Sequence, residues 1–162
     1  MNLWKLLTQC MALMLFSSTL CAQIKPTAMV LPINFVNLDK KGLQGSMNNH
    51  VKTELSTYYD LKTEKEIEQA RDAAVDKLTS ENCTEEACVK IMGELLDVEY
   101  TFSLEIIDTE EGWDLTVVRQ DIDGVSSRRN ELCIECSRKD AKGTLLAITA
   151  SSNIQSRDKP FP

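Results

Sequence analysis

Four cysteines are the side chains whose type and spacing point most directly to chemistry. They form two close pairs along the chain, Cys83 with Cys88 and Cys133 with Cys136. An even number of cysteines in an oxidising compartment predicts disulfides, here two of them. Because each pair is close in sequence and adjoins an expected helix start, we expect the bonds to join Cys83 to Cys88 and Cys133 to Cys136.

The first cysteine pair has a specific structural interpretation. Thr84 is the expected N-cap of a helix, which places Cys83 one residue before the cap and Cys88 in the first turn. Side chains at these two positions pack together in a hydrophobic staple, so a disulfide between them would fix how the chain enters the helix. Closing so short a loop contributes only about 2 kcal/mol in the chain-entropy model.

The C-x-x-C spacing of Cys133 and Cys136 leaves two other kinds of chemistry open. Redox pairs commonly open a helix that lowers the thiol pKa, whereas here the expected N-cap, Ser137, follows the motif. All four cysteines together could also bind zinc, because both spacings occur in zinc sites. The strand end before the motif favours a structural disulfide, and an oxidising compartment disfavours zinc.

No catalytic constellation can be assembled from the remaining residues. His50 is the single histidine and lies beside the apolar stripe of an expected helix. One histidine and scattered carboxylates provide neither a Ser-His-Asp or Cys-His arrangement nor a cluster of metal ligands. Asn82 begins a glycosylation sequon, a short motif that often occurs by chance. We therefore expect a protein without catalytic residues, metal or cofactor.

The first 22 residues indicate export. Lys5 is followed by an apolar stretch, and Leu20-Cys21-Ala22 resembles a signal peptidase site with cleavage near Ala22. Polar residues interrupt the stretch, which falls short of the ~20 apolar residues that a spanning helix needs. A lipid anchor on Cys21 is an alternative, although Leu20 stands where a small residue usually precedes a lipidated cysteine. We expect a periplasmic or secreted protein.

Length and charge narrow the organisation and the partners. Residues 23–150 are expected to form one domain, and residues 151–162 a flexible tail. Loss of Lys5 with the export segment leaves 17 basic residues against 25 acidic ones, a net charge near −8. Such a surface disfavours nucleic acid and anionic lipid headgroups as partners.

Hydrophobic periodicity predicts an α/β fold. Strands are expected over residues 28–36, 59–62, 98–106 and 113–117 and before Ile134, and helices over residues 43–58, 63–78, 84–96 and 137–150. Thr63 with Glu66 and Ser137 with Asp140 match the capping box. This order predicts a mixed sheet of about four to five strands with three to four helices packed on it.

Four segments carry a resemblance to a known family: AMVLPINF from Ala28, YYDLKTEKEIEQARD from Tyr58, CTEEACVKIMGELLDVEYTFSLEI from Cys83, and ELCIECS from Glu131. The series resembles bacterial envelope domains related to the curli-secretion subunit CsgG and the amino-terminal domain of TolB, over about residues 28–148. The resemblance implies an α/β envelope domain that works by contacting other proteins. It brings no catalytic residues.

The expected function is a periplasmic interaction or assembly module without catalytic activity. Its partners would be envelope proteins of unknown identity, with only indirect membrane contact and with oligomerisation left open. One alternative is a small exported thiol-disulfide or metal-binding protein that uses the C-x-x-C pair. Another is a subunit of an oligomeric outer-membrane secretion assembly, because the hairpin over residues 98–117 has the length of a β-barrel wall strand pair.

Overall fold

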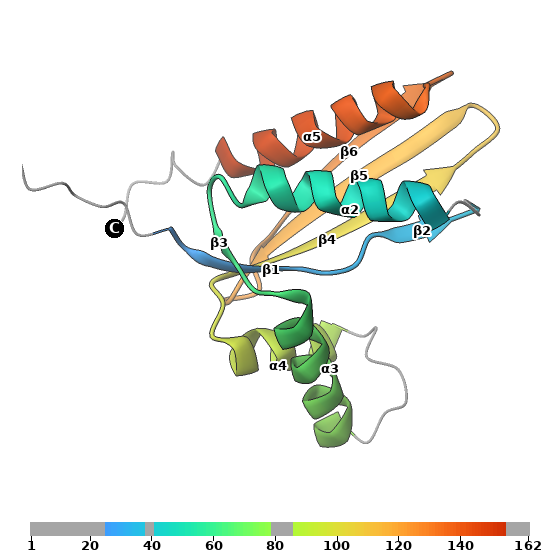
Figure 1. Ribbon diagram of the computed structural model, residues 1–162. Coiled ribbons are helices and arrows are strands. Elements are labelled where there is room, and N and C mark those ends of the chain that lie inside the picture. Colours follow the sequence, from blue (N-terminus) through green and yellow to red (C-terminus); the bar gives the residue numbers. More distant parts are fainter. Residues whose placement is uncertain (1–24, 38–40, 79–85, 155–162) are drawn as a thin grey trace, which may run out of the picture.

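The computed structural model describes residues 25–37, 41–78 and 86–154, whose arrangement is drawn in Figure 1. Along the chain the elements are β1 (Thr27–Val30), β2 (Asn34–Val36), α2 (Lys41–Leu55), β3 (Asp60–Leu61), α3 (Glu64–Leu78), α4 (Glu86–Leu96), β4 (Tyr100–Asp108), β5 (Gly112–Asp121), β6 (Ser126–Ile134) and α5 (Arg138–Ile154). This order confirms the expected α/β class.

The strands of the described residues form one mixed sheet. Its order is β3-β1-β4-β5-β6, and β2 pairs with β4 beyond the end of β1. Strands β1, β2 and β3 pair in parallel with their neighbours, whereas β4, β5 and β6 form an antiparallel meander. The sheet therefore has long strands on one side and the two-residue strand β3 at its opposite edge.

The expected first strand over residues 28–36 is divided into β1 and β2, which brings the sheet to six strands. Proline has no backbone N–H to donate to a neighbouring strand, and Pro32 stands between the two pieces. Leu31 still donates to the Phe102 carbonyl at 2.9 Å, but the Ile33 N–H turns to the side chain of Asn48 at 3.3 Å. The prediction of one continuous strand was wrong for this reason.

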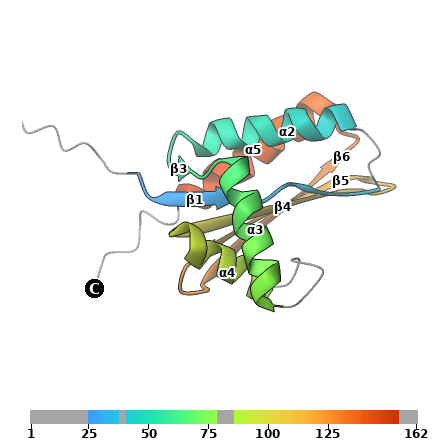
Figure 2. The ribbon, with the colours of Figure 1, turned by 60° about the horizontal axis from the view of Figure 1, so that its bottom comes forward.

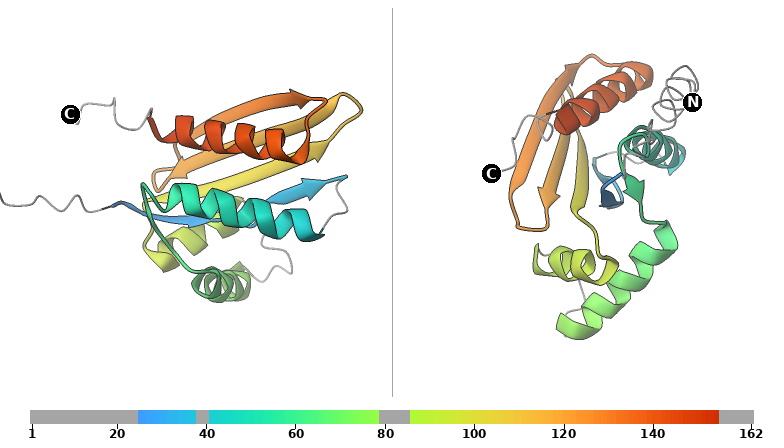
Figure 3. Two further views of the ribbon diagram at one scale, coloured as in Figure 1. Left: turned by 45° about the horizontal axis from the view of Figure 1, so that its top comes forward. Right: turned by 90° about the vertical axis from the view of Figure 1, so that its left-hand side faces the viewer.

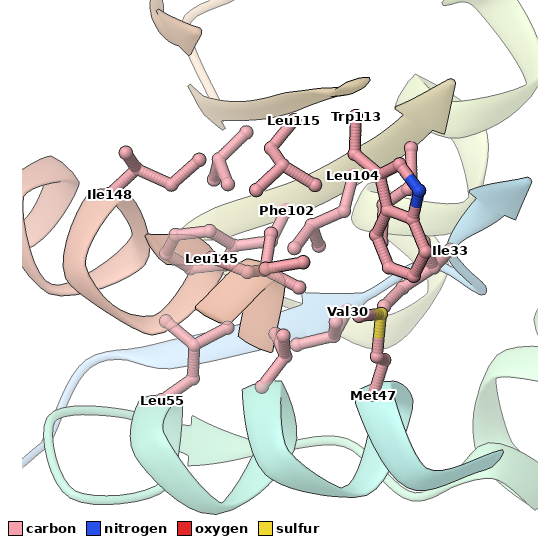
Figure 4. Close-up of a cluster of buried hydrophobic side chains, with 14 of the residues drawn as sticks. Val30, Ile33, Met47, Leu55, Phe102, Leu104, Trp113, Leu115, Leu145 and Ile148 are labelled. Carbon is pink, nitrogen blue, oxygen red and sulfur yellow. The ribbon is translucent and has the colours of Figure 1, made fainter. Parts of the chain in front are cut away.

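Helices cover both faces of the sheet. Figure 2 and Figure 3 show α2 and α5 on one face and α3 and α4 on the other. The larger core lies beneath α2 and α5, and Figure 4 shows part of it. Its buried residues come from four strands and both helices, among them Val30, Phe102, Leu104, Leu115, Met47, Val51, Leu55, Leu145 and Ile148. The second core lies beneath α3 and α4 and contains Met29, Ile67, Ala70, Ala74, Cys88, Met92 and Val98.

Side chains of β1 alternate between the two cores. Met29 belongs to the core under α3 and α4, whereas Ala28 and Val30 belong to the core under α2 and α5. All three are buried, which confirms the expectation that the start of the 28–36 segment is covered on both faces.

Both expected capping boxes in the described residues are formed. Glu66 accepts hydrogen bonds from the backbone N–H and the hydroxyl of Thr63 at 2.8 and 2.6 Å, and Asp140 accepts the same pair from Ser137 at 3.2 and 2.6 Å. These bonds stabilise the ionised carboxylate, so the pKa values of Glu66 and Asp140 lie below their ordinary values. Helix α5 continues to Ile154, past the expected end at Ala150.

Candidate interaction surface

The structure joins Cys133 and Cys136 in a disulfide where β6 passes into α5. Their Cα atoms are 5.5 Å apart, a usual separation for this bond. Glu135 between them has φ = 50°, a left-handed conformation that a side chain rarely adopts. The disulfide therefore closes a tight turn that sets the direction of α5 relative to the edge of the sheet.

Most of this disulfide is hidden from solvent. Cys133 is buried in the core under α5, with its sulfur 3.6 Å from the Thr144 hydroxyl, and Cys136 is half-buried. Thiol-disulfide exchange requires access of an attacking thiolate to a sulfur. The turn residues between the two cysteines are exposed, but the sulfur of Cys133 is not an open target.

The other cysteine pair lies on the opposite side of the sheet. Cys88 is fully buried in the core under α3 and α4 and is disulfide-bonded. Cys83 and its expected cap, Thr84, lie outside the described residues, so the bond between Cys83 and Cys88 stays a prediction. Because Cys88 and Cys133 belong to cores on opposite faces, the described cysteines do not converge on one metal ion.

Within the described ranges, no three side chains of His, Cys, Asp or Glu gather closely enough to hold a metal. His50 is half-buried on α2. A hollow of about 190 Å³ lies between α4 and the β5–β6 turn, with Lys90, Glu94, Gln120 and Asp123 among its lining residues. This volume is below the roughly 300 to 1,000 Å³ of usual ligand pockets.

The outer part of the sheet leaves one face without a covering helix. Residue register places Cys133 opposite Trp113, and both contribute to the core under α2 and α5. Since strand side chains alternate, Leu132 and Ile134 point to the opposite face. Leu132 is 43% exposed and Ile134 is 66% exposed, so nothing in the described part of the chain covers them.

Polar groups beside these two residues are bonded to one another across the strands. Asn130 donates from its side-chain amide to Asp114 on β5 and to the Thr116 hydroxyl at 3.1 Å. On β2 and β4, Asn34 donates to Glu105 at 2.8 Å. We call the exposed face formed by Asp114, Asn130, Leu132 and Ile134 the outer surface. It combines two exposed aliphatic side chains with polar groups that already have partners.

Gly112 allows β5 and β6 to approach closely beside the outer surface. A Cβ atom at Gly112 would lie 2.3 Å from the backbone oxygen of Cys133, and φ there is +150°. Any side chain would push the end of β6 away from β5. The glycine therefore helps to position both Ile134 and the disulfide.

The sequence analysis did not single out the outer surface, because residues before Ile134 were assigned only to a weaker strand. The usable signal is the alternation Arg128, Asn130, Leu132, Ile134, in which the solvent-facing positions become apolar toward the end of the strand. Exposed aliphatic residues at such positions are typical of contact surfaces.

No protein-family model matches this sequence, and no curated protein matches it. Three solved structures are similar in fold. The C-terminal domain of LpoB from Salmonella enterica has 7% identity and a TM-score of 0.47 over 70% of this chain and 87% of that one. TolB from Acinetobacter baumannii has 11% identity and a TM-score of 0.46 over 80% of this chain and 29% of that one.

LpoB from E. coli has 9% identity and a TM-score of 0.44 over 66% of this chain and 56% of that one. At such values the likeness concerns the general arrangement of helices and strands and nothing finer. Among the described helices, none is both long enough and apolar enough to cross a bilayer.

Proposed function

We propose that this chain is an exported module of the bacterial cell envelope that binds another protein and has no catalytic activity of its own. The observation that carries this proposal is the outer surface, where exposed Leu132 and Ile134 lie beside bonded Asp114 and Asn130. Protein interfaces combine an apolar centre with a polar rim in this way. The location follows from the expected export segment at residues 1–22.

The acidic surface favours a protein partner over nucleic acid or an anionic membrane surface. A net charge near −8 repels both of these, and at close range only a partner with basic or neutral surface avoids that cost. The partner is therefore expected among envelope proteins, with membrane contact only through that partner.

Affinity capture tests the proposal. The full chain, carrying a C-terminal tag and exported by the cell, is recovered from detergent-free envelope extracts together with whatever it binds. We expect one protein to be recovered in amounts comparable to the bait. Folded bait that recovers no protein above the level of an unrelated exported bait would contradict the proposal.

Two narrower functions stay open to test. A subunit of a CsgG-type secretion assembly would be recovered in the membrane fraction as a ring of many copies, not in the soluble periplasmic fraction. A thiol-disulfide protein would use Cys133 and Cys136, whose turn at Ile134 and Glu135 is exposed. The potential of that disulfide, considered in the Discussion, separates this function from a purely structural bond.

A further inference from the structure

Strand β6 has no strand partner on its outer side among the described residues. It ends the strand order β3-β1-β4-β5-β6 and is nine residues long. The backbone groups along such an edge can bond to an added strand. Charged side chains usually protect an exposed edge, so the arrangement of charges on β6 decides what the edge can accept.

The hairpin between β4 and β5 shows which backbone groups of β6 point outward. Thr109 and Gly112 exchange both of their backbone hydrogen bonds, at 2.8 and 3.3 Å. Bonded and non-bonded pairs alternate along an antiparallel ladder, so the even-numbered residues of β5 bond to β4 and the odd-numbered ones bond to β6. The outward-pointing backbone groups of β6 consequently belong to its even-numbered residues, from Ser126 to Ile134.

The side chains of Arg129 and Glu131 share the face of β6 on which α5 packs, since both register with core residues of β5. Glu131 is exposed and Arg129 is half-buried. In the part of the chain that the structure describes, neither has an ion-pair partner, and the Nε atom of Arg129 is buried without an acceptor. Both charges are therefore available for pairing across the edge.

We propose that β6 pairs antiparallel with β6 of a second copy of this chain, about a two-fold axis at Asn130. Even-numbered residues must face even-numbered residues for the outward backbone groups to bond. Centring the pair on Asn130 satisfies this rule and sets Arg129 opposite Glu131 of the other copy, twice. Opposite charges facing each other across strands are favourable.

The neighbouring registers fail on charge. Centring the pair on Arg129 sets the two Arg129 side chains against each other, and centring it on Glu131 sets the two Glu131 side chains against each other. Like charges directly opposite are unfavourable. On the other face, the Asn130 register places the stem of Arg128 over Leu132 of the second copy, which removes exposed apolar surface from water.

This inference goes beyond the proposed function, because it concerns a second copy of the chain and not an envelope partner. The two fail independently: a monomer can still capture a partner, and a dimer can capture none. Their tests also use different variants.

Charge reversal tests the register. Sedimentation velocity of the purified protein is expected to show a dimer, and Arg129→Glu or Glu131→Arg is expected to raise the dissociation constant at least about tenfold. The double variant with both reversals restores the opposite pairs and should restore the dimer. A monomeric wild-type protein, or a dimer that both single variants leave unchanged, would overturn the proposal.

A cross-link tests the position of the axis. The Cα atoms of two residues facing each other in a hydrogen-bonded antiparallel pair are ~5.5 Å apart, within disulfide range. The Asn130→Cys variant should therefore form a covalent dimer under mild oxidation. The control Arg128→Cys places its two copies roughly 13 Å apart along the strands and should stay uncross-linked. Cross-linking of Arg128→Cys in preference to Asn130→Cys would overturn the axis.

Discussion

Asn130 on β6 donates a hydrogen bond from its side-chain amide to the carboxylate of Asp114 on β5. In the strand register Asn130 faces Thr116, and Asp114 faces Leu132, so this bond is diagonal across the pair. The second bond from Asn130, to the Thr116 hydroxyl, runs straight across. Thr116 is 6% exposed, so its hydroxyl would be costly to leave without a partner. The Asn130 amide therefore holds the edge strand in register.

Removing this amide should weaken the edge of the sheet. The Asn130→Ala variant is expected to lose about 1 to 2 kcal/mol in free energy of unfolding, because both hydrogen bonds disappear. Urea unfolding followed by circular dichroism measures this loss. Ser126→Ala on the same strand is the control and should change stability by less than about 0.5 kcal/mol. Equal effects of the two variants would contradict the role of Asn130.

Gly112 and Gly143 offer a matched pair of glycine substitutions. The Gly112→Ala variant places a Cβ atom 2.3 Å from the Cys133 oxygen and is expected to lose at least about 2 kcal/mol. Gly143 lies inside α5 with no atom within 4 Å of its added Cβ, so Gly143→Ala should gain about 0.5 to 1 kcal/mol. Thermal unfolding of both variants checks the opposite signs. A neutral Gly112→Ala would mean that β5 and β6 are not closely paired there.

The capping carboxylate of Asp140 predicts a dependence of stability on pH. Hydrogen bonds from Ser137 lower the pKa of Asp140 in the folded protein. A carboxyl whose folded pKa is lowered contributes stability above its unfolded pKa of about 3.9, and this contribution is lost as the pH falls through the folded pKa. The stability difference between wild type and Asp140→Asn should therefore shrink from about pH 5 toward pH 2. A difference that stays constant over this range would contradict the prediction.

The disulfide between Cys133 and Cys136 is expected to be structural. Replacing both cysteines by alanine should cost about 2 kcal/mol without abolishing folding, because the closed loop is short. Its reduction potential should lie below about −300 mV, as for structural disulfides. Equilibration with glutathione or dithiothreitol buffers and quantification of free thiols measures it. A value near about −200 mV would favour the thiol-disulfide function instead.

Local sequence patterns predicted the elements that depend on neighbouring residues. The two capping boxes and the strict alternation of residues 98–106 correspond to α3, α5 and β4, because each pattern involves side chains only a few positions apart. The break at Pro32 was missed, since the apolar run from Ala28 to Val36 hides a residue that cannot donate to a strand.

The outer surface depends on relationships that no local pattern contains. Leu132 and Ile134 are exposed because α3 and α4 lie on the β1 side of the sheet and leave this part of the face uncovered. The free edge at β6 likewise follows from the strand order, which the sequence analysis left open. Tertiary arrangement, not residue type, turns these positions into a candidate contact surface.

The most direct test of the central claim compares two leucines with nearly equal exposure. Leu132 on the outer surface is 43% exposed, and Leu95 on α4 is 42% exposed. Each is changed to aspartate in the tagged chain, folding is verified by circular dichroism, and the captured envelope protein is quantified. We expect Leu132→Asp to reduce capture at least about tenfold, because an interface must then bury a charge, and Leu95→Asp to leave capture unchanged. Unchanged capture by Leu132→Asp, or an equal loss with Leu95→Asp, would contradict binding through the outer surface.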